Sequence, residues 1–169
     1  FVMRFAGEGG QGVVTSAEGF AQAAAQEGYH IQTFATFPSQ IMGGPTWTQT
    51  RISTSEVLSS GDALDVLVAF NEEAYNTHKD EVKKDGVIIY NSGDFEINDN
   101  GSSIKTLGIP FDELAKSTGN TRASNMVVMG ALADLVNMPQ SILETFVTKK
   151  FTRGRPNDEQ IISSNIQAL

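Results

Sequence analysis

A short glycine-rich segment carries the residues of this sequence best suited to chemistry. Its spacing, Gly7-x-Gly9-x-x-Gly12, falls between a strand-like run and a helical run. In that context Gly7 permits a tight turn, and Gly12 lets the helix pack close to the sheet. The free backbone N–H groups of the first helical turn then face whatever binds there. The segment therefore predicts an anion site made by Gly7, Gly9, Gly10, Gln11, Gly12 and Thr15, with Ser16 as a further hydroxyl donor.

The same segment departs from the known nucleotide motifs. A site for NAD needs an Asp or Glu about 20 residues further on, and a site for NADP favours an arginine there. Residues 32–36 read QTFAT and offer neither. The loop also lacks the lysine followed by Ser or Thr that completes a Walker A motif. The pattern therefore favours a phosphate or carboxylate site without a nicotinamide, and a close turn that binds nothing is the alternative.

A second segment, residues 36–45 (TFPSQIMGGP), has the composition of an interface loop. Three of its side chains are large and apolar although the segment reads as irregular, and burial against a partner explains them naturally. Two glycines before a proline permit a sharp, close approach, and the proline should hold Gly44 extended. We expect this loop to dock toward a partner domain through Phe37, Pro38, Ser39, Gln40, Ile41, Met42, Gly43 and Gly44, with Ser39 and Gln40 as polar tips. The alternative is a loop that covers its own core.

The remaining polar residues have simpler interpretations. His78 falls at helical spacing with Asn71 and Tyr75, which predicts a structural place on a helix and no chemistry. Arg122 and Asn125 open a buried helix as polar anchors. Four cations lie near the end of another helix, where they suit the helix dipole, although they could also meet an acidic partner or an anionic ligand: Lys149, Lys150, Arg153 and Arg155. No residue is assigned a catalytic role.

Composition excludes several classes of protein. The 169 residues include no cysteine and two histidines, which excludes iron–sulfur ligation, thiolate zinc sites and a histidine-based metal site in this chain. A net charge of −8 argues against nucleic-acid binding. No apolar run approaches the ~20 residues of a membrane span, and no signal peptide is visible. We therefore expect a cytoplasmic protein that binds no metal.

The order of apolar and helical runs predicts the fold. Short strand-like runs alternate with helical ones, which is typical of a three-layer α/β/α sandwich around a mostly parallel sheet. The first strand, loop and helix are Rossmann-like, and no linker or repeat divides the chain, so residues 1–169 are expected to form one domain. Strands are predicted over residues 1–6, 31–35, 47–53, 65–70, 86–90 and 104–109. Helices are predicted over residues 13–27, 111–116, 121–136 and 139–151, after an Asn71 cap, and from residue 156 on.

Parallel strands bring their carboxyl ends to one edge of a sheet, where ligands gather. Four segments should therefore line one cleft there: the glycine loop, residues 36–45, Asn71 and residues 92–93.

Three stretches in this order carry a resemblance to one family: GEGGQGVVTSAEGFAQAA (7–24), TFPSQIMGGPTWTQTRIS (36–53) and GDALDVLVAFNEEA (61–74). They resemble the gamma subunit or domain of 2-oxoacid:ferredoxin oxidoreductases. The similarity is greatest to the gamma domain fused ahead of the alpha subunit in 2-oxoglutarate oxidoreductases. One departure is Met42, which stands where many relatives carry an arginine.

The resemblance implies a role within a larger enzyme. That enzyme decarboxylates a 2-oxoacid oxidatively, yields an acyl-CoA and passes electrons to ferredoxin. Thiamine diphosphate and iron–sulfur clusters are expected on the alpha and beta parts, and the gamma domain is expected to contribute assembly and contacts to CoA without being active alone. A free-standing nucleotide-binding module and a purely structural interaction domain are the competing hypotheses. Self-association of the chain and the identity of the 2-oxoacid stay open.

Overall fold

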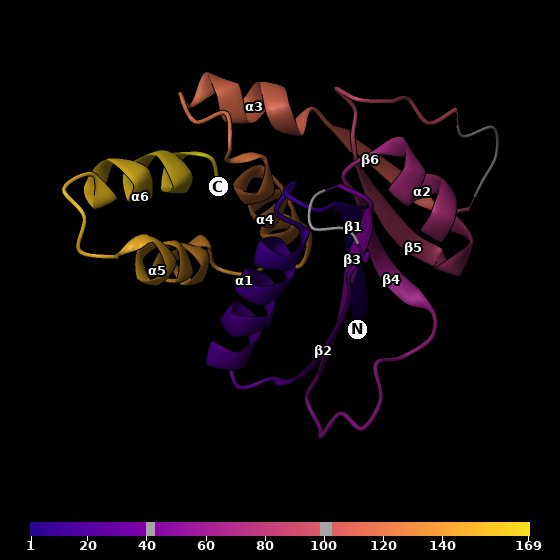
Figure 1. Cartoon of the computed structure of the whole chain (residues 1–169). Coiled ribbons are helices and arrows are strands. Elements are labelled where there is room, and N and C mark those ends of the chain that lie inside the picture. Colours follow the sequence, from indigo (N-terminus) through magenta and orange to yellow (C-terminus); the bar gives the residue numbers. More distant parts are fainter. Residues whose placement is uncertain (40–42, 99–102) are drawn as a thin grey trace.

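A six-stranded mixed sheet organises the computed structural model, which describes residues 1–39, 43–98 and 103–169 (Figure 1). The strand order is β2-β3-β1-β4-β5-β6. β1, β4, β5 and β6 pair in parallel, whereas β3 is antiparallel to both β1 and β2. The predicted α/β fold with a mostly parallel sheet is confirmed, and β3 runs against the rest. The strands are β1 (Val2–Glu8), β2 (His30–Thr36), β3 (Pro45–Ser53), β4 (Leu64–Ala69), β5 (Val82–Asn91) and β6 (Lys105–Ile109).

Helices lie on both faces of this sheet, as the predicted three-layer arrangement requires. On one face α1 packs against β1, β2 and β3, with α4 and α5 packed against α1. On the other face α2 packs against β1 and β4. Helix α6 packs on α5, away from α2 (Figure 1). The helices are α1 (Val13–Gln26), α2 (Glu72–His78), α3 (Phe111–Ser117), α4 (Ser124–Leu135), α5 (Gln140–Phe151) and α6 (Asp158–Gln167), with a 3₁₀ turn η1 (Lys79–Glu81).

The element boundaries follow local signals with small differences. Asn71 caps α2 as predicted, because its Oδ1 accepts a hydrogen bond from the backbone N–H of Ala74 at 2.8 Å. Helix α4 begins three residues later than the predicted Thr121, and α5 begins directly after Pro139. Among the described residues, none of the helices combines the length and apolar character that a membrane crossing needs.

Two apolar cores form because successive strand residues point to opposite faces. Toward α1, Met3 and Phe5 are buried with Phe20 of α1 and residues of α4 and α5. Toward α2, Val2 and Ala6 are buried with neighbours from β4 and β5. Strand β4 is almost wholly buried, as expected for a strand covered on both faces.

A buried polar network lies on the α2 face of the sheet. Arg4, 5% exposed, donates from Nε and Nη2 to Gln49 Oε1 at 3.1 and 2.7 Å. Its Nη1 reaches His78 Nδ1 at 2.8 Å and also pairs with Glu81. The guanidinium carbon lies 4.3 Å from the centre of the Trp47 ring. Because this arginine is charged and buried, its hydrogen bonds to Gln49, its ion pair with Glu81 and its contact with the Trp47 ring offset part of its desolvation cost.

The network sets the charge states of its members. Burial lowers the pKa of His78 and the charge of Arg4 adds to the effect, although the contact with Glu81 opposes it. Burial alone would raise the pKa of Glu81, but hydrogen bonds from Arg4 and His78 outweigh it, so the pKa lies below its ordinary value. At neutral pH the network therefore holds a neutral imidazole between a cation and an anion.

The histidine should make stability depend on pH. Because the pKa of His78 is lowered in the folded chain, the unfolded chain binds its proton at higher pH than the folded chain does. The stabilisation is complete above the ordinary pKa of 6.5 and is lost as pH falls below it. The free energy of unfolding falls by ~1.4 kcal/mol for each unit that separates the pKa of His78 in the unfolded chain from its pKa in the folded chain. We expect urea unfolding from about pH 7.5 to pH 5.5 to show this loss, and His78→Gln to lack it.

His30 is exposed, so the His30→Gln chain supplies the control for this experiment and should keep the decline assigned to His78. The contribution of Glu81 is lost only below its ordinary pKa of 4.5 and stays outside the chosen range. An equal decline in the His78→Gln chain would contradict the assignment.

Candidate functional site

The glycine loop leaves the end of β1 in a conformation that only glycine adopts readily. Gly10 has a φ of +104° and Gly12 a φ of +88°, both in the left-handed region. Among the described residues, a Cβ built on Gly10 meets no atom within 4 Å, so none of them fills the space in front of the loop. A Cβ on Gly12 would lie 2.6 Å from the Cβ of Asn125 on α4. The residue closest to a Cβ at position 12 is therefore on another helix, whereas the sequence suggested a close approach to the sheet.

Gln11 folds back over the loop and closes its inner side. Its Oε1 accepts hydrogen bonds from the backbone N–H of Glu8 at 2.7 Å and from Asn71 Nδ2 at 3.3 Å. A Cβ on Gly7 would lie 2.5 Å from the same oxygen, which explains the first glycine of the motif. Within the described residues Gln11 Nε2 makes no hydrogen bond, and it stays available as a donor.

The two hydroxyl groups of the first helical turn differ. Ser16 is buried and donates from Oγ to the carbonyl of Gly12 at 3.0 Å, so it is not the free donor that the sequence suggested. Thr15 is half-buried and lines the open side of the loop, as expected of a binding residue.

The segments predicted to share one edge of the sheet do lie together. The backbone N–H of Gly9 donates to the carbonyl of Gly44 at 3.3 Å, which ties the glycine loop to the second loop. Asn71 joins them through Gln11. At the end of β5, Asn91 Oδ1 accepts from the N–H of Gly93 at 3.4 Å. Because β1, β4 and β5 are parallel, their carboxyl ends lie at the same edge of the sheet. Of the four segments predicted to line one cleft, only the glycine loop is among the described residues that line the cleft at this edge.

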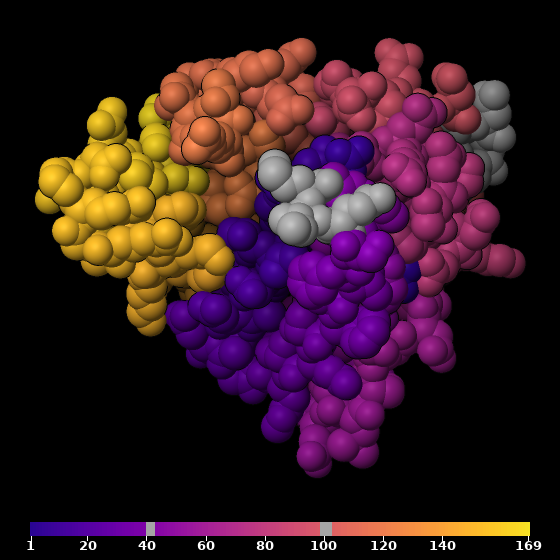
Figure 2. Space-filling view, viewed as in Figure 1, coloured from indigo at the N-terminus to yellow at the C-terminus, as the bar shows by residue number. Residues whose placement is uncertain are grey.

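A cleft of about 460 Å³ opens on the α1 side of this edge. One wall is the glycine loop with Thr15, and the other comes from α4, from the end of α5 and from the turn before α6. Figure 2 shows α5 and α6, in gold and yellow, beside the indigo α1 that follows the loop. Four cations line the cleft and make it suitable for an anion: Arg122, Lys150, Arg153 and Arg155.

Sequence reasoning did not place these cations at the site. Lys150, Arg153 and Arg155 were interpreted mainly as helix-end charges, and Arg122 as an anchor of a turn. Lys149, from the same group, does not line the cleft. No spacing rule relates residues near position 150 to a loop near position 10, because only the packing of α5 on α1 brings them together.

The described part of the second loop is exposed. Phe37 is 68% exposed, Pro38 is half-buried and Ser39 is exposed. Gly43 and Gly44 both have a positive φ, which fits the predicted sharp turn. The prediction that Gly44 is held extended is wrong, because its φ is +82°. The predicted interface residues Gln40, Ile41 and Met42 lie outside the described residues.

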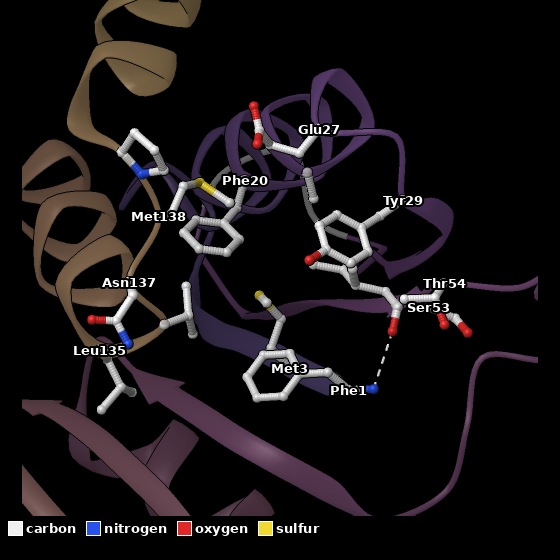
Figure 3. Close-up of a pocket in the computed structure, with 14 residues that line it drawn as sticks. Phe1, Met3, Phe20, Glu27, Tyr29, Ser53, Thr54, Leu135, Asn137 and Met138 are labelled. Carbon is white, nitrogen blue, oxygen red and sulfur yellow. Dashed lines mark hydrogen bonds between the residues drawn. The ribbon is translucent and has the colours of Figure 1, made fainter.

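Other hollows suit an anion less well. A small cavity of about 190 Å³ lies beside Gly7 on the α2 face, between Trp47 and His78. A larger one of about 680 Å³ lies at the opposite edge, where β1 begins (Figure 3). Figure 3 shows it framed by aromatic and aliphatic side chains, with Glu27 as its charged residue. In the described ranges no group of three His, Asp or Glu side chains could hold a metal ion.

A family model described as pyruvate ferredoxin/flavodoxin oxidoreductase matches residues 2–169. The chain belongs to this family. This finding confirms the resemblance predicted from the three sequence stretches.

Individual oxidoreductases of the family define the extent of the similarity. The ketoisovalerate oxidoreductase subunit VorA of Methanothermobacter thermautotrophicus is 31% identical over 175 residues, which cover 99% of this chain and 34% of VorA. A structure of the 2-oxoglutarate:ferredoxin oxidoreductase of Magnetococcus marinus, with 2-oxoglutarate, coenzyme A and succinyl-CoA bound, is 35% identical with a TM-score of 0.91. That match covers 99% of this chain and 29% of the other. The chain thus spans about a third of these longer relatives.

A shorter member of the oxidoreductase family matches along almost its whole length. The structure of the keto/oxoacid ferredoxin oxidoreductase gamma subunit of Geobacter sulfurreducens has a TM-score of 0.80 at 23% identity, over 99% of this chain and 93% of that one. At this identity the likeness shows a shared fold.

The close approach of Gly12 to Asn125 predicts a specific loss of stability. In Gly12→Ala the new Cβ meets the Cβ of Asn125, which cannot move without its backbone. Gly28→Ala is the matched control, because Gly28 has a φ of +85° and open space around its Cβ position. We expect Gly12→Ala to lose about 1–3 kcal/mol more than Gly28→Ala in urea unfolding. Equal losses would show that backbone strain alone matters.

Proposed function

We propose that this chain is the gamma domain of a CoA-dependent 2-oxoacid:ferredoxin oxidoreductase. Its family membership and the likeness to a relative that holds 2-oxoglutarate, coenzyme A and succinyl-CoA support the proposal. The assembled cytoplasmic enzyme converts a 2-oxoacid, CoA and oxidised ferredoxin to an acyl-CoA, carbon dioxide and reduced ferredoxin. Residues 1–169 form one domain of it and contribute binding and assembly.

The catalytic groups belong to partner parts in this proposal. The chain has no cysteine with which to ligate an iron–sulfur cluster. The alpha and beta parts therefore carry thiamine diphosphate and the clusters, and ferredoxin is a partner of the assembled enzyme rather than of this domain.

The glycine loop is the proposed contact for a phosphate of CoA. Its supporting observation is that no described residue fills the space before Gly10, at the mouth of a cleft lined by cations. The first-turn amides of α1 lie behind that space and carry the positive end of the helix dipole. Gln11 Nε2 and the hydroxyl of Thr15 are the side-chain donors of this proposal.

A substitution at Gly10 tests this contact. Gly10→Asp places a carboxylate in the open space, where it repels a phosphate, and Gly10→Asn has the same size and backbone strain without the charge. In the assembled oxidoreductase we expect Gly10→Asp to raise the KM for CoA about 10-fold more than Gly10→Asn does. The measurement is the CoA dependence of 2-oxoacid oxidation with a viologen acceptor. Equal KM values for the two variants would refute a phosphate at the loop.

The second loop is the proposed contact with the alpha part. Phe37 is 68% exposed, and nearby Phe34 of β2 is 51% exposed with its ring 5.6 Å from that of Trp47. Exposed aromatic side chains close to one another favour a protein interface. The loop joins the glycine loop through Gly9 and Gly44, so docking there would bring the partner to the edge of the proposed CoA site.

A charge on this loop should weaken assembly. Phe37→Asp would bury an unpaired carboxylate at the interface, which costs several kcal/mol. The control is Leu58→Asp, because Leu58 is 84% exposed in a different loop. The measurement is sedimentation of the complex on dilution. We expect the subunit concentration at which the complex dissociates to rise about 10-fold or more for Phe37→Asp and to stay unchanged for Leu58→Asp. Intact complexes with both variants would place the interface elsewhere.

A further inference from the structure

Strand β2 forms one edge of the sheet, and its sequence does little to protect that edge. It pairs with β3 along its whole length without a register shift, and no described strand pairs with its other side. Its seven residues, HIQTFAT, include no Asp, Glu, Lys, Arg or Pro. The opposite edge strand, β6, has five residues and carries Lys105. Because a regular edge invites pairing with another chain, exposed edges are usually blocked by charge, proline or a bulge. The edge of β2 is therefore expected to be covered.

The register shows which backbone groups of β2 point outward. Phe1 and Ile52 exchange two hydrogen bonds, so Ile52 and every second residue before it in β3 turn their backbone groups toward β1. The residues between them turn toward β2, where they pair with its even-numbered residues. The odd-numbered residues of β2 therefore point their N–H and C=O groups away from the sheet: Ile31, Thr33 and Ala35. No backbone hydrogen bond joins these groups to another described residue.

Exposed aromatic side chains surround this open edge. Phe34 lies on the sheet face where α2 packs against β1 and β4, and it is 51% exposed. Tyr29, directly before the strand, is 44% exposed, and Phe37, directly after it, is 68% exposed. Apolar side chains grouped at an open sheet edge favour a contact with another protein chain.

We propose that β2 pairs with β2 of a second copy of this chain, antiparallel and about a two-fold axis at Thr33. In this register Thr33 exchanges two hydrogen bonds with Thr33 of the second copy, and Ile31 does so with Ala35 of the second copy. All the outward backbone groups of both strands are then paired. The two sheets continue into each other, and the same surface of each copy forms the contact, as two-fold symmetry requires.

The spacing of residues around β2 is the reason to choose a second copy as the partner. Tyr29 and Phe37 are equally far from Thr33 in the sequence, so the two-fold axis brings each Tyr29 opposite Phe37 of the second copy. Phe34 comes opposite Gln32, in a pair without backbone hydrogen bonds, where side chains lie closest. No charged carboxylates, lysines or arginines of the two strands repel each other, because β2 has none. The inference goes beyond the proposed function, which leaves the second loop to the alpha part.

A cysteine at the axis tests this pairing, because the chain has no cysteine of its own. In a hydrogen-bonded antiparallel pair the two Cα atoms lie about 5.5 Å apart, within the range of about 4.4–6.8 Å that disulfides span. In the assembled oxidoreductase, mild oxidation of Thr33→Cys should link two copies of this chain, and a reducing agent should separate them. The control is Leu58→Cys, because Leu58 is 84% exposed in the loop between β3 and β4.

Peptide mass spectrometry identifies the linked residues, which separates this disulfide from cysteines of other parts. We expect at least about 10-fold more linked pairs with Thr33→Cys than with Leu58→Cys, since only the first thiol faces its own copy at bonding distance.

Loss of the outward N–H at the axis should weaken the pairing. Thr33→Pro removes this donor from both copies and leaves the hydrogen bonds with β3 in place, because residue 33 points away from β3. Thr33→Ala is the control, because it keeps the N–H. Loss of two hydrogen bonds should raise the concentration at which the two copies separate about 10-fold relative to Thr33→Ala. The measurement is sedimentation of the assembled oxidoreductase on dilution.

Three results would overturn the inference. Thr33→Cys could give no more linked pairs than Leu58→Cys, Thr33→Pro could behave as Thr33→Ala does, or the new thiol could bond to the alpha or beta part. The last result would identify a strand of that part as the partner of β2. Failure of the proposed alpha contact at Phe37 is distinguishable, because loss of the alpha part changes the composition of the complex, whereas loss of the pairing changes only its number of copies.

Discussion

The left-handed backbone at Gly12 is the constraint on which the candidate site depends. This residue ends the turn from β1 and begins α1, and its missing side chain lets Asn125 of α4 approach within contact distance. Helix α4 can therefore begin directly beside the glycine loop, and α5 packs on both α1 and α4. The far wall of the cleft exists because these three helices converge there. A side chain at position 12 would separate them and widen the site at its base.

Two different uses of arginine coexist in the chain. Arg4 is buried, and its guanidinium group contacts Gln49, His78, Glu81 and Trp47. Its charge therefore interacts with groups inside the α2 face and not with a ligand. Arg122 and Arg153 are exposed and unpaired within the described residues. A buried arginine without partners would be strongly destabilising, whereas an exposed one costs the fold little. Folding therefore explains the surroundings of Arg4 but gives no reason for the grouping of the cations at the cleft.

Much of the fold could be predicted because its signals are local. The glycine spacing after an apolar run marks the β1–α1 turn, and Asn71 before two glutamates marks the start of α2, where the structure has both. The alternation of residues 47–53 predicted a strand, but not that β3 would run antiparallel between β1 and β2. The direction of a strand depends on its partners, which alternation does not encode.

The candidate site was only half predictable for the same reason. Its glycine wall follows from spacing within six residues, whereas Lys150 reaches that wall through helix packing across more than a hundred residues, as its contact with Glu18 shows. Sequence reasoning also did not find the structural contacts of Gln11. Its oxygen satisfies Glu8 and Asn71 within the loop, a contact that depends on where β4 ends.

A domain without catalytic groups can still determine how fast its enzyme works. Contacts to parts of a substrate that do not react can offset the cost of positioning and desolvating the part that does. In the proposed arrangement the nucleotide end of CoA lies on this chain and the thiol reaches the chemistry on a partner. The division explains why the cleft at the carboxyl edge is rich in cations, whereas the cavity at the opposite edge is apolar. Placement of the cleft by Gly12, and of the turn before α6 by Asp158, would limit the motion of a nucleotide bound as proposed. Binding of the nucleotide end of CoA would restrict the positions that the thiol can reach. This chain would therefore raise the effective concentration of the thiol at the reacting carbon.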